Sequence, residues 1–202
     1  MSDCGCRHEA RNPGERRILW IALALNAAMA VIGGVAGWIA ESTGLWADAL
    51  DMLSDAGAYA IGLLAVGRSL RFKTNAARLI GIVLLLLGVG VVAEVIRRAI
   101  YGAEPLSAWM IGVALLSLTV NIIVLRMLAP LKSGEIHLRA TWISTRADVV
   151  ANFGVILAGT LVWVLGSPYP DLIVGAAIGV YIVKEAFEIL TDANRAQPAP
   201  PA

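Results

Sequence analysis

Residues Ile18–Ala40 have the sequence ILWIALALNAAMAVIGGVAGWIA, an apolar run of 23 residues without a charged side chain. A helix needs about 20 apolar residues to cross a bilayer. The run is too long for the apolar part of a cleavable signal peptide, and it ends in Trp38-Ile-Ala-Glu41, which lacks the small residues that a signal peptidase requires. We therefore predict that Ile18–Ala40 is a membrane-spanning helix, the first of the chain.

Five further segments after this run are apolar over a similar length. Lipid offers no partner for backbone N–H and C=O groups, so each segment is expected to be helical. The fold class predicted is an all-α membrane protein with six transmembrane helices. The further spans are Leu45–Val66, Leu79–Ile96, Ala108–Leu125, Trp142–Leu165 and Leu172–Val183, the last continuing as an amphipathic helix to Leu190.

Composition agrees with a membrane location. Of the 202 residues 58% are hydrophobic and only 15% are charged, whereas about a quarter of a soluble domain is charged. The two cysteines lie together near the start, which excludes a disulfide framework. Basic residues are not pooled in one patch, so nucleic acid is not an expected partner. We find no nucleophile–base pair and no phosphate-binding loop, and we expect neither an enzyme nor a cofactor.

The distribution of Lys and Arg predicts the orientation, because these residues favour cytoplasmic flanks. Eleven lie on one side of the predicted spans and two on the other, which places both termini in the cytoplasm. We expect a cytoplasmic tail over 1–17, a transport domain over 18–190 and a short disordered tail over 191–202, in a multi-pass protein of the bacterial inner membrane. The eleven are Arg7, Arg11, Arg16, Arg17, Arg68, Arg71, Lys73, Arg78, Arg126, Lys132 and Arg139; the two are Arg97 and Arg98.

Acidic residues within the predicted spans indicate a cation site. An ionisable side chain at bilayer depth costs about 2.5–3.5 kcal/mol on the insertion scale. The second span nevertheless carries Asp48, Asp51 and Asp55 on one helical face, and the fifth carries Asp148. Like charges repel unless a positive charge is bound between them. We therefore predict that Asp51, Asp55 and Asp148 bind a cation, while Asp48 serves either the site or helix packing.

Polar side chains extend the acidic position of the fifth span. Ser144 precedes Asp148 by four residues and Asn152 follows it by four, with Thr145 on the same side. Such spacing places them on one helical stripe. The stripe and the acidic face of the second span could close around a cation.

Two stretches carry a resemblance to a known family. Gly44-Leu-Trp-Ala-Asp-Ala-Leu-Asp-Met-Leu-Ser-Asp-Ala-Gly57 resembles the second span of the cation diffusion facilitator family, in which Asp or His is followed by Asp four residues later. Arg139-Ala-Thr-Trp-Ile-Ser-Thr-Arg-Ala-Asp-Val-Val-Ala-Asn152 resembles its fifth span, and Tyr169–Val180 resembles the entry to its sixth. The similarity covers approximately Ile18 to Leu190.

The resemblance implies proton-coupled efflux of Zn²⁺, Cd²⁺ or a similar ion, with Asp51, Asp55, Ser144 and Asp148 as metal ligands. Asp48 and Asn152 are additional candidates. Metal binds the ionised carboxylate, so binding would release protons. The family usually has His or Asp where this chain has Ser144, and an all-oxygen site suits harder ions better than Zn²⁺. Mn²⁺, Co²⁺ and Fe²⁺ therefore stay among the candidate substrates.

Two further departures from the family concern regions outside the site. The loop after the second span, Arg71–Arg78, lacks the family's histidines. The family's cytoplasmic C-terminal domain is missing, so we expect a short member reduced to the transport core. A homodimer is an alternative use of the small residues Gly33, Gly34 and Gly37, which could equally pack within one chain.

The N-terminal tail holds a second group of metal ligands. Cys4, Cys6 and His8 offer two thiols and an imidazole, which suit Zn²⁺ or Cd²⁺. A metal-capturing tail and incidental cysteines are equally compatible with this pattern.

Other charged and aromatic residues define competing functions. Arg146 could compensate the acidic site, which would make the chain a non-transporting membrane subunit or a metal sensor. An organic cation exporter would need aromatic lining, and only Trp46 and Trp142 lie near the acidic faces. Lys184, Glu185 and Glu188 are expected on a solvated cytoplasmic face, and Glu94 is expected to pair locally with Arg97 and Arg98.

Overall fold

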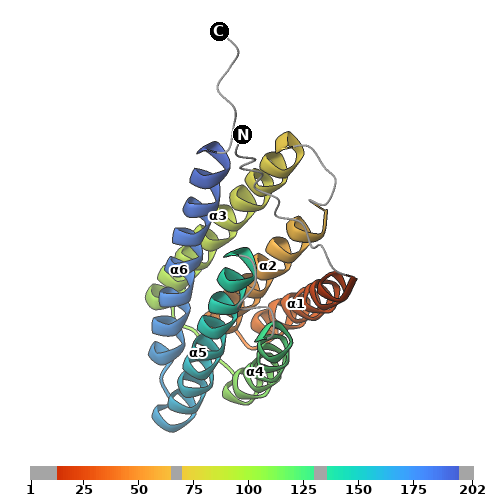
Figure 1. Cartoon of the computed structure of the whole chain (residues 1–202). Coiled ribbons are helices and arrows are strands. Elements are labelled where there is room, and N and C mark those ends of the chain that lie inside the picture. Colours follow the sequence, from red (N-terminus) through yellow and green to blue (C-terminus); the bar gives the residue numbers. More distant parts are fainter. Residues whose placement is uncertain (1–12, 65–69, 130–135, 196–202) are drawn as a thin grey trace, which may run out of the picture.

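The computed structural model describes residues 13–64, 70–129 and 136–195; at some helical positions, 136–144 among them, it describes the backbone alone. Cys4, Cys6 and His8 lie outside the described residues, and so does the side chain of Ser144. All regular structure in the described part is helical (Figure 1). The helices are α1 (Pro13–Ile39), α2 (Thr43–Leu64), α3 (Leu70–Tyr101), α4 (Ser107–Leu128), α5 (Ile136–Leu165) and α6 (Tyr169–Arg195).

The helices form one bundle in which α2 occupies the centre. α1 packs mainly on α2, α3 on α6 and α4 on α5, and α2 contacts each of the other five helices. The start of α1 and the end of α6 lie toward the same end of the bundle (Figure 1). The central position of α2 explains how a membrane helix can carry three aspartates, because its acidic face meets protein rather than lipid.

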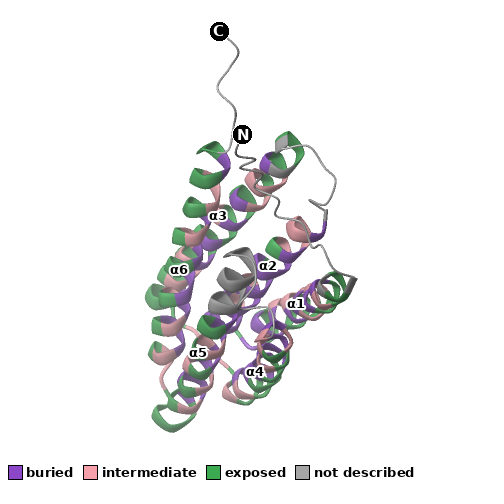
Figure 2. Cartoon of the chain, in the orientation of Figure 1, coloured by how far each residue is buried: buried purple, intermediate pink, exposed green. Residues whose placement is uncertain are grey.

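Large apolar side chains cover much of the outer surface, as expected of a protein in lipid. Trp163 is 74% exposed, Ile100 70% and Leu86 69%. Buried residues face the bundle interior and exposed residues face outward on most helices (Figure 2). Soluble monomers rarely expose large contiguous apolar patches.

Four of the helices are long and apolar enough to cross a membrane by length and composition. α2 and α6 fall outside this group because three aspartates interrupt α2 and because Asp171, Lys184, Glu185 and Glu188 interrupt α6. The four segments are Arg16–Ile39, Thr74–Tyr101, Ser107–Leu128 and Thr145–Leu165.

Several helices extend beyond the apolar runs from which they were predicted. α3 begins at Leu70 rather than near Leu79, and α6 continues to Arg195. No Gly or Pro interrupts residues 70–79, and a helix can continue outside the bilayer because its backbone hydrogen bonds are internal. Gly102 and Gly166, both at positive φ, end α3 and α5 with N–H bonds to Arg98 and Val162.

Candidate functional site

The three aspartates of α2 are all buried, and Asp48 has a partner of its own. The side chains of Asp48, Asp51 and Asp55 are 2%, 8% and 8% exposed. The Ser117 hydroxyl of α4 donates a hydrogen bond of 2.7 Å to Asp48 Oδ2. Asp48 therefore faces α4 and joins two helices, which agrees with the packing role weighed for it.

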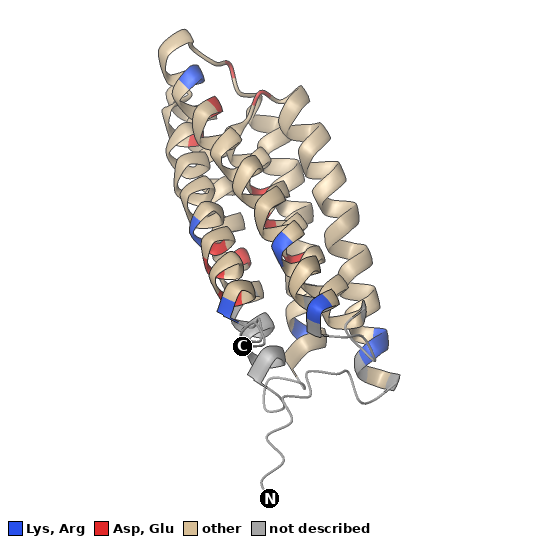
Figure 3. Cartoon of the chain, turned by 90° about the horizontal axis from the view of Figure 1, so that it is seen from above, with Lys and Arg blue, Asp and Glu red and all other residues tan. Residues whose placement is uncertain are grey.

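The other two aspartates meet the acidic residue of α5. The carboxyl group of Asp148 interacts with those of Asp51 and Asp55, and Asp148 is itself 5% exposed. The structure thus brings together the three carboxyl groups predicted to share a site. Figure 3 shows acidic residues within the helices of the bundle, away from its ends.

Polar groups on α5 surround Asp148. The Asn152 amide donates 2.8 Å to the Asp148 backbone carbonyl, while Asn152 Oδ1 and Asp148 Oδ2 are buried without a hydrogen-bond partner among the described residues. Thr145 is fully buried, with its hydroxyl 3.5 Å from that of Tyr59 on α2. α5 therefore carries two buried oxygen atoms, Asp148 Oδ2 and Asn152 Oδ1, of the kind that binds hard and borderline cations.

The carboxyl groups are neighbours but do not form a closed coordination shell. Within residues 13–64, 70–129 and 136–195, no three side chains of His, Cys, Asp or Glu are arranged so that they could hold a metal ion. A cation entering between α2 and α5 would have to draw these side chains toward a common centre.

Glu185 is a fourth acidic residue that the sequence-based interpretation placed wrongly. It was expected on a solvated face with Lys184 and Glu188, which are indeed exposed and lie 3.7 Å apart. Glu185 instead is half-buried, and its carboxyl group accepts a hydrogen bond from Ser54 and acts electrostatically on Asp51 and Asp55. The spacing contained a signal for this, because Glu185 follows the buried Ile178 by seven residues and so shares its helical face.

A family comparison bears on this geometry. Residues 19–196 match a family model described as a cation efflux transmembrane domain. The match covers most of the chain. It includes Asp51, Asp55, Asp148 and Glu185.

The chain belongs to the cation efflux family.

Relatives with established names come from several bacteria. The metal cation efflux system protein CzcD of Cupriavidus metallidurans is 27% identical over 92% of this chain and 63% of its own length. The zinc transporter ZitB of Yersinia pestis is 28% identical over 91% and 62%, and a cadmium, cobalt and zinc/H⁺-K⁺ antiporter of Bacillus velezensis is 22% identical over 93% and 64%. The chain spans just under two thirds of the length of these proteins. Their names describe transport, not enzymatic catalysis.

In this cation efflux protein, Arg146 is not among the groups that act electrostatically on Asp51 and Asp148. Its side chain is exposed, whereas Asp51, Asp55 and Asp148 are buried. The groups that act electrostatically on Asp51 and Asp148 are themselves acidic.

Of the two tryptophans expected near the acidic faces, the structure describes the side chain of Trp46. Trp46 packs against Trp38, with ring centroids 6.3 Å apart, and lines a cavity beside the end of α3. The side chain of Trp142 lies outside the described residues. Among the described aromatic residues, Tyr59 and Tyr181 lie close enough to Asp55 and Asp148 to interact with them electrostatically.

Asp171 is the second residue that the sequence-based interpretation missed. Its carboxylate, 1% exposed at the start of α6, accepts hydrogen bonds from the Thr43 and Gly44 backbone N–H groups at 2.7 and 3.0 Å. The Ser42 and Thr43 hydroxyls donate to it at 2.6 and 3.0 Å. Asp171 therefore holds the start of α6 on the start of α2, the helix that carries three of the acidic residues.

Proposed function

We propose that this chain exports divalent metal cations from the cytoplasm in exchange for protons, with the cation bound between α2 and α5. The observation that carries the proposal is the burial together of Asp51, Asp55 and Asp148. The groups that act electrostatically on Asp51 and Asp148 are acidic. Buried like charges require a bound proton or cation. If protons and the metal ion occupy the same carboxylate oxygens in turn, export of the metal is coupled to entry of protons.

The proposed ligands are Asp51, Asp55 and Asp148, with Ser144 or Asn152 completing the site. Asn152 Oδ1 supports this, because it is buried on α5 without a partner among the described residues. Oxygen ligands alone would favour Mn²⁺, Co²⁺ or Fe²⁺ relative to sites with His or Cys, although the relatives named above are described for zinc, cadmium and cobalt. A metal-capturing tail at Cys4, Cys6 and His8 would add softer ligands.

The proposed topology has six spans, with α2 and α6 crossing the membrane inside the bundle and both termini in the cytoplasm of a bacterial inner membrane. Most Lys and Arg of the described residues lie toward the end of the bundle where α1 begins and α6 ends (Figure 3), which supports this orientation because these residues favour cytoplasmic flanks. Exchange would then deliver the cation toward the end where α1 meets α2.

The test is uptake of Zn²⁺, Cd²⁺, Mn²⁺, Co²⁺ and Fe²⁺ into inside-out vesicles with an acidic interior. Uptake is compared between vesicles with and without a potassium gradient, which distinguishes exchange for protons from exchange for potassium. We expect gradient-driven uptake of at least one ion by the wild type. The double variant Asp51→Asn with Asp55→Asn, and separately Asp148→Asn, should reduce it by at least about tenfold, because each removes negative ligands.

Asp192→Asn is the matched control, since Asp192 is an exposed aspartate near the end of α6. It should transport like the wild type. Unchanged uptake in the folded Asp51→Asn, Asp55→Asn variant would exclude the proposed site. A folded wild-type chain that moved none of the five ions would exclude export by this chain.

A further inference from the structure

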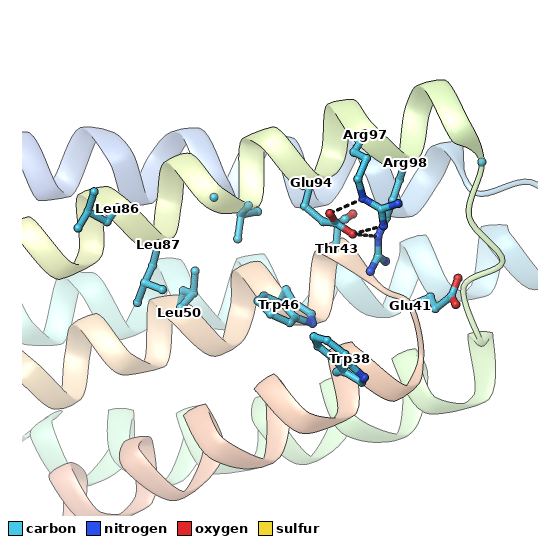
Figure 4. Close-up of a pocket in the computed structure, with 13 residues that line it drawn as sticks. Trp38, Glu41, Thr43, Trp46, Leu50, Leu86, Leu87, Glu94, Arg97 and Arg98 are labelled. Atoms are coloured by element: carbon cyan, nitrogen blue, oxygen red, sulfur yellow. Dashed lines mark hydrogen bonds and ion pairs between the residues drawn. The ribbon is translucent and has the colours of Figure 1, made fainter.

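A cavity of about 630 Å³ lies between the end of α1, the start of α2 and the second half of α3, and neither Asp51 nor Asp148 lines it. Its lining changes from polar to apolar along its length. In Figure 4, Glu94 and Arg98 lie at one end and Leu50, Leu86 and Leu87 lie at the other. The cavity is of the size that holds part of a small organic ligand.

Two buried hydrogen-bond donors at the polar end lack an acceptor. Arg98 is 8% exposed, and its Nη1 has no hydrogen-bond partner among the described residues; neither has Trp46 Nε1. Figure 4 shows the Arg98 guanidinium and the nitrogen-bearing edge of Trp46 at the same end of the cavity. Buried donors in native proteins are normally paired, so this pair indicates a ligand with an acceptor group.

The neighbouring carboxylate cannot satisfy both arginines. Glu94 accepts 2.7 Å hydrogen bonds from Arg97 Nε and Nη2 and a 2.6 Å bond from Arg98 Nε. None of these bonds uses Arg98 Nη1, while Arg97 is also acted on electrostatically by Glu41. Glu41, the other acidic lining residue, lies apart from Arg98 on the loop after α1 (Figure 4). The position next to Arg98 Nη1 therefore favours an anionic acceptor.

The apolar end opens toward the surface that faces lipid. Leu86 is 69% exposed and Leu87 is 36% exposed. From Leu86 to Arg98 the helix rises about 18 Å, at about 1.5 Å per residue. Trp38 and Tyr101, 73% and 80% exposed at the polar end, are residue types that gather at the membrane–water interface. Arg98 thus lies near headgroup depth and Leu86 near acyl-chain depth.

We propose that this cavity is a phospholipid site, in which the phosphodiester accepts hydrogen bonds from Arg98 Nη1 and Trp46 Nε1 and one acyl chain lies along Leu50, Leu86 and Leu87. A soluble anion would satisfy the two donors but would leave the apolar wall unused. An apolar lipid would fill the wall but would leave the donors unpaired. A phospholipid matches both ends.

The test is native mass spectrometry of the delipidated full chain in detergent, titrated with phosphatidylglycerol. Arg98→Gln is compared with Arg97→Gln: each variant removes one partner of Glu94, but Arg97 is exposed. We expect Arg98→Gln to weaken lipid retention by about tenfold, the cost of one charged hydrogen bond. Arg97→Gln should stay within about twofold of the wild type. Equal retention by the two folded variants would overturn the proposal.

Two further variants keep the test decisive if Arg98→Gln does not fold. Trp46→Phe keeps an aromatic ring and removes the donor, so it should weaken retention severalfold. Gly90 lines the cavity, and no atom lies within 4 Å of the position that its Cβ would occupy. Gly90→Leu should therefore place a side chain in the cavity and block the acyl chain. Gly34→Leu is the control, because a Cβ at Gly34 is equally unobstructed. Retention unchanged by both Trp46→Phe and Gly90→Leu would exclude this cavity.

Two competitors identify the chemistry. Inorganic phosphate and diacylglycerol should each fail to displace phosphatidylglycerol, because each matches one end of the cavity only. Displacement by inorganic phosphate alone would indicate a simple anion site, and displacement by diacylglycerol alone would indicate a purely apolar one. Either result would overturn the phospholipid assignment.

Discussion

The Asp171 carboxylate, on α6, caps the N-terminus of α2. Helix N-termini leave backbone N–H groups without an intrahelical partner, and a negative charge there is stabilised by about 0.3–1 kcal/mol, or up to about 2 kcal/mol when partly buried. Here the carboxylate binds the N–H groups of Thr43 and Gly44, while the Ser42 hydroxyl accepts from the Leu45 N–H at 3.1 Å. The cap is therefore also a tertiary contact.

Replacing this carboxylate tests its role in stability. Asp171→Asn keeps the size of the side chain but removes the charge and turns one acceptor into a donor that faces backbone N–H groups. We expect a loss of about 1–3 kcal/mol in the free energy of unfolding, measured as a lower melting temperature in detergent. Asp192→Asn, at the exposed far end of α6, should leave the melting temperature unchanged, and equal melting of the two variants would contradict the capping role.

Residues on the acidic face could be predicted because their spacing is local. Asp51 and Asp55 lie four residues apart on one helix. A charged residue in an apolar run indicates a functional site whichever helices surround it. Asp171 and Ser42 are 129 positions apart, and Glu185 meets Ser54 only because α6 packs on α2. Such contacts depend on which helices pack together. Apolar runs of similar composition do not determine this packing.

Among the helices, the α2–α6 contact depends on a residue without a side chain. A Cβ atom on Gly175 would lie 2.5 Å from Thr43 Oγ1 and 2.8 Å from the Thr43 backbone carbon. These distances are too short for any side chain, and the backbone cannot move aside cheaply. Gly175 thus permits the close approach that places Asp171 over the start of α2.

A methyl group at this position should separate the two helices. Gly175→Ala is expected to destabilise the protein by about 1–3 kcal/mol through overpacking, although alanine favours an isolated helix by about 1 kcal/mol. Thermal unfolding in detergent gives the measurement. Gly154→Ala is the control, because its Cβ would meet only Val174 Cγ1 at 3.9 Å; this variant should be as stable as the wild type or slightly more so. Equal stability of both variants would show that the α2–α6 contact tolerates expansion.

The ends of the helices were less predictable than their existence. Apolar runs locate the segments that lipid surrounds, and they correctly placed the centres of all six helices. The first turns of α3, which include Arg71 and Phe72, are polar enough to resemble a loop. Outside the bilayer both loop and helix satisfy the backbone, so hydropathy does not distinguish them.

The whole molecule carries its charges asymmetrically, and this asymmetry predicts which end faces the cytoplasm. Glu104, between α3 and α4, and Asp192, near the end of α6, are exposed toward opposite ends of the bundle. A chain with both termini inside would present Glu104 to the outside and Asp192 to the cytoplasm.

Cysteine labelling tests this orientation in a background with Cys4→Ser and Cys6→Ser. A membrane-impermeant maleimide added to intact cells, with access to the periplasm, should label Glu104→Cys. It should label Asp192→Cys only after the inner membrane is permeabilised. The reverse pattern would invert the proposed direction of transport. Labelling of both sites in intact cells would place them on one side of the membrane and would exclude the six-span topology, which puts three spans between them.

The cap at Asp171 also has a mechanical consequence. It fastens α6 to α2 at one end of two helices that run in the same direction, and so it acts as a fulcrum. Glu185 lies 14 residues farther along α6, a lever arm of about 21 Å at about 1.5 Å per residue. A tilt of about 5° around Asp171 would displace Glu185 by about 2 Å relative to Ser54 while the fastened end scarcely moves. Small rotations of α6 would thus become larger displacements of Glu185 beside Asp51 and Asp55.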